Sequence, residues 1–137
     1  FAMKDFVCKC GDCQENIRIS LGLIGGLELL RSKLKARIEI IKGYVCSECA
    51  EKEGKVKRNY HNLGIAADIK SNSAGLKDLF LQAEEIPEFK GIGINLSQKY
   101  IHVDSRKDEE RTMWVVDAGE NIPLTADNRD QYLEKIQ

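Results

Sequence analysis

The sequence predicts an α+β fold in which a small antiparallel sheet has helices packed on it. Three features of the 137-residue chain support this prediction. Leucines three or four residues apart mark an early helix, a second helical period follows mid-chain, and short β-branched runs occupy much of the second half. Strands that are not regularly separated by helices are typical of antiparallel α+β sheets.

Apolar periodicity predicts three helices. The spaced leucines predict a helix over residues 17–35, whose last turn carries basic side chains, although the Gly25-Gly26 pair costs it about 1 kcal/mol per glycine. A second helix is predicted over residues 74–86, and a third, lying on the surface, over residues 126–136.

Short runs of β-branched and aromatic residues predict the strands. These runs are residues 37–41, 65–69, 92–94, 100–103 and 113–116. Residues 46–59 are polar and charged, which predicts a loop or a short irregular helix. Met113 and Trp114 are predicted to fill the core rather than to line a cleft.

Length and composition fit a single domain over residues 1–137, with 1–5 as a flexible start or tag and 117–137 as a C-terminal extension. A net charge of −1 supplies no general basic field, so a nucleic acid is not expected as a partner. No run reaches the ~20 apolar residues of a membrane span. No signal peptide is visible in this chain, whose start could have been trimmed.

The chain has two histidines, and each lies near an aspartate. His61 precedes Asp68 by seven residues, and a glycine and two alanines between them allow the backbone to fold back. His102 and Asp104 lie two positions apart in an expected strand, so their side chains share a face. A single histidine is more often a surface or hydrogen-bonded residue than a ligand. Catalytic zinc takes three protein ligands and leaves a fourth position to water, so the two motifs together predict one zinc site formed by His61, Asp68 and His102.

These motifs resemble those of the M15 zinc peptidases, which include D-alanyl-D-alanine carboxypeptidases and phage endolysins and share a fold with the hedgehog signalling domain. The resemblance covers about residues 6–116 and rests on four segments, which are FVCKCG (6–11), HNLGIAAD (61–68), GIGI (91–94) and YIHVDSR (100–106). It implies zinc on His61, Asp68 and His102. It also implies hydrolysis of peptidoglycan stem or cross-bridge peptides, often beside a D-amino acid, by a zinc-activated water and a carboxylate that moves the proton. A monomer in the cell envelope, or one associated with a phage, is expected.

Two positions depart from the family pattern. Many relatives have an acid three residues before the last zinc histidine, where this chain has Lys99, and a substrate-facing arginine where it has Val45. Asp104 is then the candidate base, or it orients a ligand or binds a backbone N–H. Arg106 is the candidate for binding a substrate carboxylate or for supporting a metal ligand, and Arg58 is an alternative for the missing arginine. These changes also allow a catalytically silent zinc domain that recognises peptide or glycan.

The five cysteines lie in two clusters within the first 49 residues. Two CxxC pairs predict a second, structural zinc site, whose ligands would be Cys10, Cys13, Cys46 and Cys49. Cys8 would not take part in this site. One or two disulfides in an exported protein, or buried free thiols, are the alternatives. A further rival is a zinc-ribbon interaction module in which only the cysteines bind metal.

Overall fold

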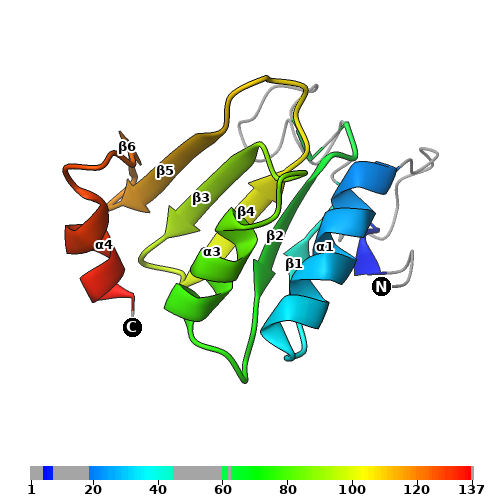
Figure 1. Ribbon diagram of the computed structural model, residues 1–137, viewed down its shortest axis with the longest axis horizontal. Coiled ribbons are helices and arrows are strands. Elements are labelled where there is room, and N and C mark those ends of the chain that lie inside the picture. Colours follow the sequence, from blue (N-terminus) through cyan, green and yellow to red (C-terminus); the bar gives the residue numbers. More distant parts are fainter. Residues whose placement is uncertain (1–4, 8–18, 45–59, 62, 137) are drawn as a thin grey trace.

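The computed structural model describes residues 5–7, 19–44, 60–61 and 63–136 of the chain (Figure 1). This part of the chain forms three helices and a six-stranded sheet, which confirms the predicted α+β class. The helices are α1 (Leu21–Leu34), α3 (Leu76–Glu84) and α4 (Arg129–Lys135). The strands are β1 (Glu39–Lys42), β2 (Ala66–Lys70), β3 (Gly91–Asn95), β4 (Tyr100–Asp104), β5 (Thr112–Asp117) and β6 (Glu120–Pro123).

The strands lie in the order β1-β2-β4-β3-β5-β6. All neighbours pair antiparallel except β3 and β5, which are parallel, so the prediction of an antiparallel sheet holds for four of five pairs. Strand β6 is not among the strands that the sequence predicts. It pairs with β5 through a tight turn in which Ala118 and Gly119 both have positive φ (51° and 82°), as a type I′ hairpin turn requires. Residues after 117 therefore add a strand to the same sheet.

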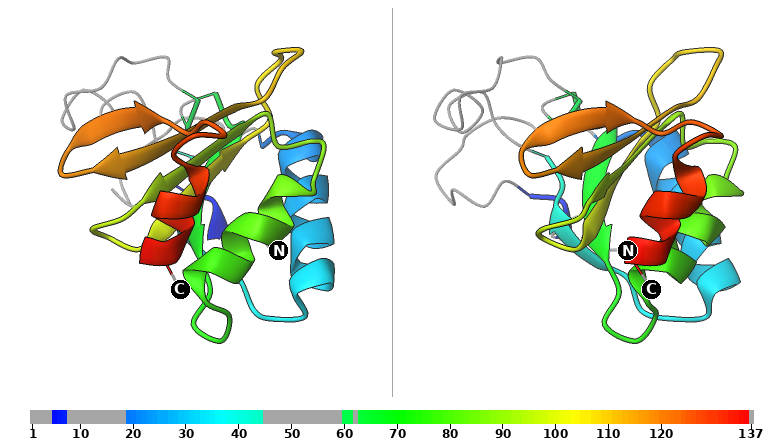
Figure 2. Two further views of the ribbon diagram at one scale, coloured as in Figure 1. Left: turned by 60° about the vertical axis from the view of Figure 1, so that its left-hand side comes forward. Right: turned by 90° about the vertical axis from the view of Figure 1, so that its left-hand side faces the viewer.

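All three helices pack on one face of the sheet (Figure 2). Helix α1 begins where the Ser20 hydroxyl accepts a hydrogen bond from the Leu23 amide, and it ends at Lys35 in the left-handed conformation. The core between helices and sheet combines leucines of α1, Phe80 of α3, and Tyr132 and other side chains of α4 with isoleucines of β2, β3 and β4. None of the helices in the described ranges is long and apolar enough to cross a membrane.

The side chains of each strand alternate between this core and the opposite face of the sheet. Ile69 and Ile101 point into the core and are fully buried. Their neighbours Asp68 and His102 are paired across β2 and β4, so both point to the face opposite the three described helices. The fold therefore separates an apolar face, which holds the domain together, from a polar face available for chemistry.

Candidate metal centre

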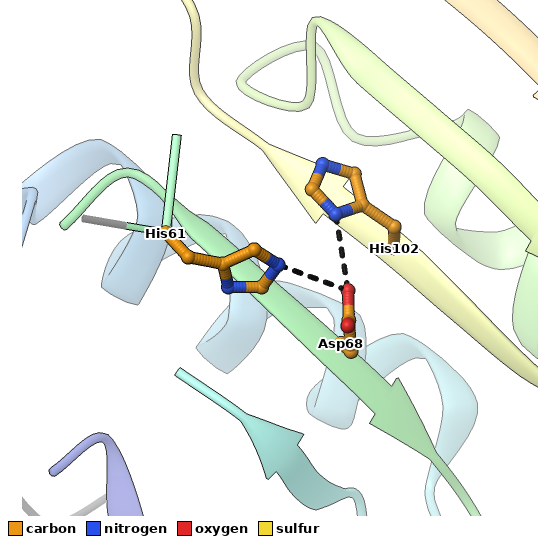
Figure 3. A group of neighbouring side chains, drawn as sticks. All are labelled: His61, Asp68 and His102. Atoms are coloured by element: carbon orange, nitrogen blue, oxygen red, sulfur yellow. Dashed lines mark hydrogen bonds and ion pairs between the residues drawn. The ribbon is translucent and has the colours of Figure 1, made fainter. Parts of the chain in front are cut away.

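His61, Asp68 and His102 converge on the polar face of the sheet (Figure 3). Asp68 lies on β2 and His102 directly opposite on β4, while His61 approaches from the turn before β2. One carboxylate oxygen, Asp68 Oδ1, lies 3.0 Å from His102 Nδ1 and 3.3 Å from His61 Nε2. One donor atom from each residue lies within 4.8 Å of the others, so the three predicted ligands do come together.

The turn between His61 and β2 accounts for the spacing of seven residues. Gly64 has a φ of 75°, which a glycine adopts without strain, and its amide donates to the His61 carbonyl at 3.1 Å. The Ile65 amide donates to the Tyr60 carbonyl, closing the turn, and the Gly64 carbonyl accepts from the Ser20 amide at the start of α1. The backbone therefore folds back and returns His61 to the level of Asp68.

The Gly43 carbonyl fixes the tautomer of His61. His61 Nδ1 lies 2.8 Å from this oxygen, which can only accept, so Nδ1 donates to it and Nε2 is the nitrogen that faces Asp68. Phe6 packs against Gly43, where an added Cβ would lie 2.7 Å from the Phe6 Cα. A glycine at position 43 is thus part of the support of the first histidine.

His102 lies between two carboxylates. Its Nδ1 faces Asp68, and its Nε2 is 2.8 Å from Asp104 Oδ2. Burial alone would raise the pKa of Asp68 and of Asp104. Hydrogen bonds from the two histidines to Asp68, and from Arg106 and His102 to Asp104, outweigh it and hold both pKa values well below their usual range. Burial likewise disfavours charge on His102, but the two carboxylates raise its pKa overall.

The donor set and its spacing fit a zinc ion. Two donors 2.0–2.1 Å from a tetrahedral ion stand about 3.3 Å apart. The 3.3 Å and 3.0 Å separations from Asp68 Oδ1 to the two histidine nitrogens agree with this value. The ligand side chains retain 10–17% of their exposure, so solvent reaches the centre. Three protein donors with access for water correspond to a catalytic rather than a closed structural site.

The centre opens into a cavity of about 530 Å³. Aromatic and amide side chains that the sequence reading did not assign to the site surround the ligands, among them Tyr60, Asn95, Trp114 and Asn121. The prediction of a core position fits Met113, which packs against the core, but is wrong for Trp114. Trp114 follows Met113 on β5 and points the opposite way, with its ring centroid 5.4 Å from that of His102. The period of two along β5 was the signal that could have separated them.

The other predicted site residues have different outcomes. Arg106 lines the cavity and binds Asp104, which is fully buried behind His102. Lys99 occupies the turn between β3 and β4 and is exposed. The remaining sequence predictions fall outside the described residues; they concern Val45, Arg58 and the cysteines Cys8, Cys10, Cys13, Cys46 and Cys49.

A polar sheet face whose His-Asp-His group lines a cavity defines a candidate metallohydrolase centre. Comparison with protein families names the class more closely. The model of the family Peptidase M15 matches residues 1–104, about three quarters of the chain, and the protein belongs to that family. The match ends at Asp104, and so includes all three candidate ligands. Comparison with curated proteins gave no significant match.

Proposed function

We propose that the protein is a zinc-dependent peptidase that hydrolyses peptidoglycan stem or cross-bridge peptides, including bonds next to D-amino acids. The observation that carries the proposal is the three-donor centre of His61, Asp68 and His102 at a solvent-reached cavity in a chain of the M15 family. Peptidoglycan as substrate rests on the family resemblance. We further propose action at the cell envelope or in a phage lysis system, and a monomeric state.

The residues of the centre and of the cavity wall have different proposed roles. Asp68 stays anionic and His61 offers Nε2, so two of the three donors are ready to bind a cation. A zinc ion bound there would lower the pKa of its water and polarise the scissile carbonyl. Tyr60, Trp114 and the other cavity walls limit bulk water around the peptide, and Asn95 and Asn121 offer amide groups to its backbone.

One observation favours a second candidate, a zinc domain that binds peptide or glycan without cleaving it. Among the described residues, Asp68 is the one carboxylate that lines the cavity, and it is a ligand. A peptidase needs a group that takes a proton from water and delivers it to the leaving amine. The silent domain would keep the metal and the cavity but lack this step.

Digestion of purified muropeptides separates the two candidates. The zinc-loaded protein, the same sample treated with chelator, and the Asp68→Asn protein are each incubated with a panel of tri-, tetra- and pentapeptide muropeptides and cross-linked dimers. Mass spectrometry identifies the products. The peptidase proposal predicts cleavage that chelator removes, that added zinc restores, and that Asp68→Asn lacks. Binding of muropeptides without any chelator-sensitive product across the panel would support the silent domain and contradict the peptidase.

A further inference from the structure

The ion pair between Asp104 and Arg106 lies directly behind His102, on the side of the imidazole away from Asp68. Asp104 is fully buried. Its Oδ2 is 2.8 Å from both His102 Nε2 and Arg106 Nη2, and its Oδ1 is 2.8 Å from Arg106 Nε and 3.2 Å from the Arg106 amide. A carboxylate has about four acceptor positions, so all of those on Asp104 are in use.

This arrangement does not suit a general base. A base must reach the water from which it takes a proton. The two nitrogens of His102 lie on opposite edges of its ring, so Asp104 on Nε2 and Asp68 on Nδ1 lie on opposite sides of that ring. A paired carboxylate can only accept a hydrogen bond, so Nε2 donates to Asp104, and Nδ1, on the Asp68 side, is the nitrogen that could give its lone pair to a metal ion.

Arg106 is in turn fixed by its neighbours. Its guanidinium carbon lies 4.4 Å from the ring centroid of Tyr60 and 5.4 Å from that of Trp114. The planar fork binds both oxygens of Asp104, which restrains the carboxylate in rotation as well as in position. Gly91 provides the space, since a Cβ there would lie 2.2 Å from Asp104 Oδ2 and 2.6 Å from Arg106 Nη2.

We propose that Asp104 and Arg106 are a positioning pair that fixes the tautomer and ring plane of His102, so that Nδ1 is the nitrogen presented to the metal. The proposal rests on the metal centre of the proposed function and does not depend on peptide cleavage. Asp104 aligns His102 through the hydrogen bond at Nε2, and the fork of Arg106 holds Asp104 in place.

The first test is the nitrogen assignment in the unmodified zinc-loaded protein, by long-range ¹H–¹⁵N correlation spectroscopy of its two histidines. The proposal predicts that His102 is protonated at Nε2 and ligated through Nδ1, whereas His61 is ligated through Nε2. Ligation of His102 through Nε2, or no ligation of His102, would overturn it. Because this measurement needs no variant, it stands even where a substitution prevents folding.

The second test is zinc affinity by competition with a chromophoric chelator. Asp104→Asn keeps the volume and removes the charge, and we expect its affinity to fall about 10–100-fold. Arg106→Lys keeps the charge but loses the fork, and we expect a smaller loss. Asp117→Asn at the end of β5 is the control and should bind zinc as the unmodified protein does. Circular dichroism checks the fold of each variant.

The outcomes separate this proposal from the proposed function. Asp104→Asn with full zinc affinity but no turnover would overturn the positioning role and reinstate Asp104 as a base in a working peptidase. Asp104→Asn with weakened zinc binding, in a protein that cleaves no muropeptide, would support the positioning pair while the peptidase proposal fails.

Discussion

Replacing Gly93 by alanine is expected to disturb the candidate centre without removing any polar group. Gly93 lies on β3 directly opposite His102, and the Trp114 ring covers it. An added Cβ would lie 2.4 Å from both Cε2 and Nε1 of Trp114, far inside contact distance, so the indole must tilt or β5 must move. Overpacking of this kind costs about 1–3 kcal/mol. For a chain of this length that corresponds to a fall in Tm of roughly 3–9 °C.

Trp114 is the one tryptophan of the chain, so its fluorescence reports directly on this position. Thermal unfolding followed by fluorescence should show the lower Tm of Gly93→Ala and a shifted emission maximum in the folded state. Gly25→Ala is the matched control. A Cβ at position 25 meets nothing within 4 Å and gains helix propensity, so this variant should be more stable by about 0.5–1 kcal/mol, with unchanged emission. Unchanged Tm and emission in Gly93→Ala would refute the placement of Trp114 over β3.

Three further predictions concern the core, the metal and helix α3. Gly26→Ala gains the same helix propensity as Gly25→Ala, yet it should destabilise the protein by about 1–3 kcal/mol in urea denaturation, because its Cβ would lie 2.6 Å from the buried ring of Phe89. A stabilised variant would contradict this packing. Zinc at 100 times its dissociation constant should add about 2.7 kcal/mol to the free energy of unfolding, and chelator should remove this gain. His61→Ala should keep its fold but lose the gain, and an equal gain in the variant would exclude His61 as a ligand. Arg111 donates hydrogen bonds to the carbonyl of residue 84, the last residue of α3, and to those of residues 86 and 89 beyond it. Arg111→Ala should therefore cost about 2–3 kcal/mol in the same urea assay, and a loss below 0.5 kcal/mol would count against that role.

The convergence of His61, Asp68 and His102 could be predicted because the spacing that produces it is local. The spacing of His61 and Asp68 around Gly64 indicates a backbone that turns back, and the alternation of His102 and Asp104 indicates a shared strand face. The structure has both features. The helix boundaries were less accurate: helix α1 begins at Leu21 because Ser20 caps it, although its leucine period alone gives no starting residue.

The contacts that support the ligands could not be predicted, because they join segments far apart in the sequence. The Gly43 carbonyl reaches His61 over 18 positions, and no side-chain pattern marks a carbonyl as a partner. The parallel pairing of β3 with β5 places Trp114 beside Gly93, and strand order is not contained in the period of either strand. Strand β6 is half polar and ends at Pro123, so it lacks the alternation that marks a buried strand.

The most direct test of the account is an anomalous difference map at the zinc absorption edge, from crystals of the zinc-loaded protein. A zinc ion held by the three side chains would give a peak about 2.0–2.2 Å from His61 Nε2, Asp68 Oδ1 and His102 Nδ1, with a fourth position open to water. A second peak among the cysteines would add a structural zinc ion and leave this claim intact. No peak at the His-Asp-His group, with zinc found only at cysteines, would contradict it.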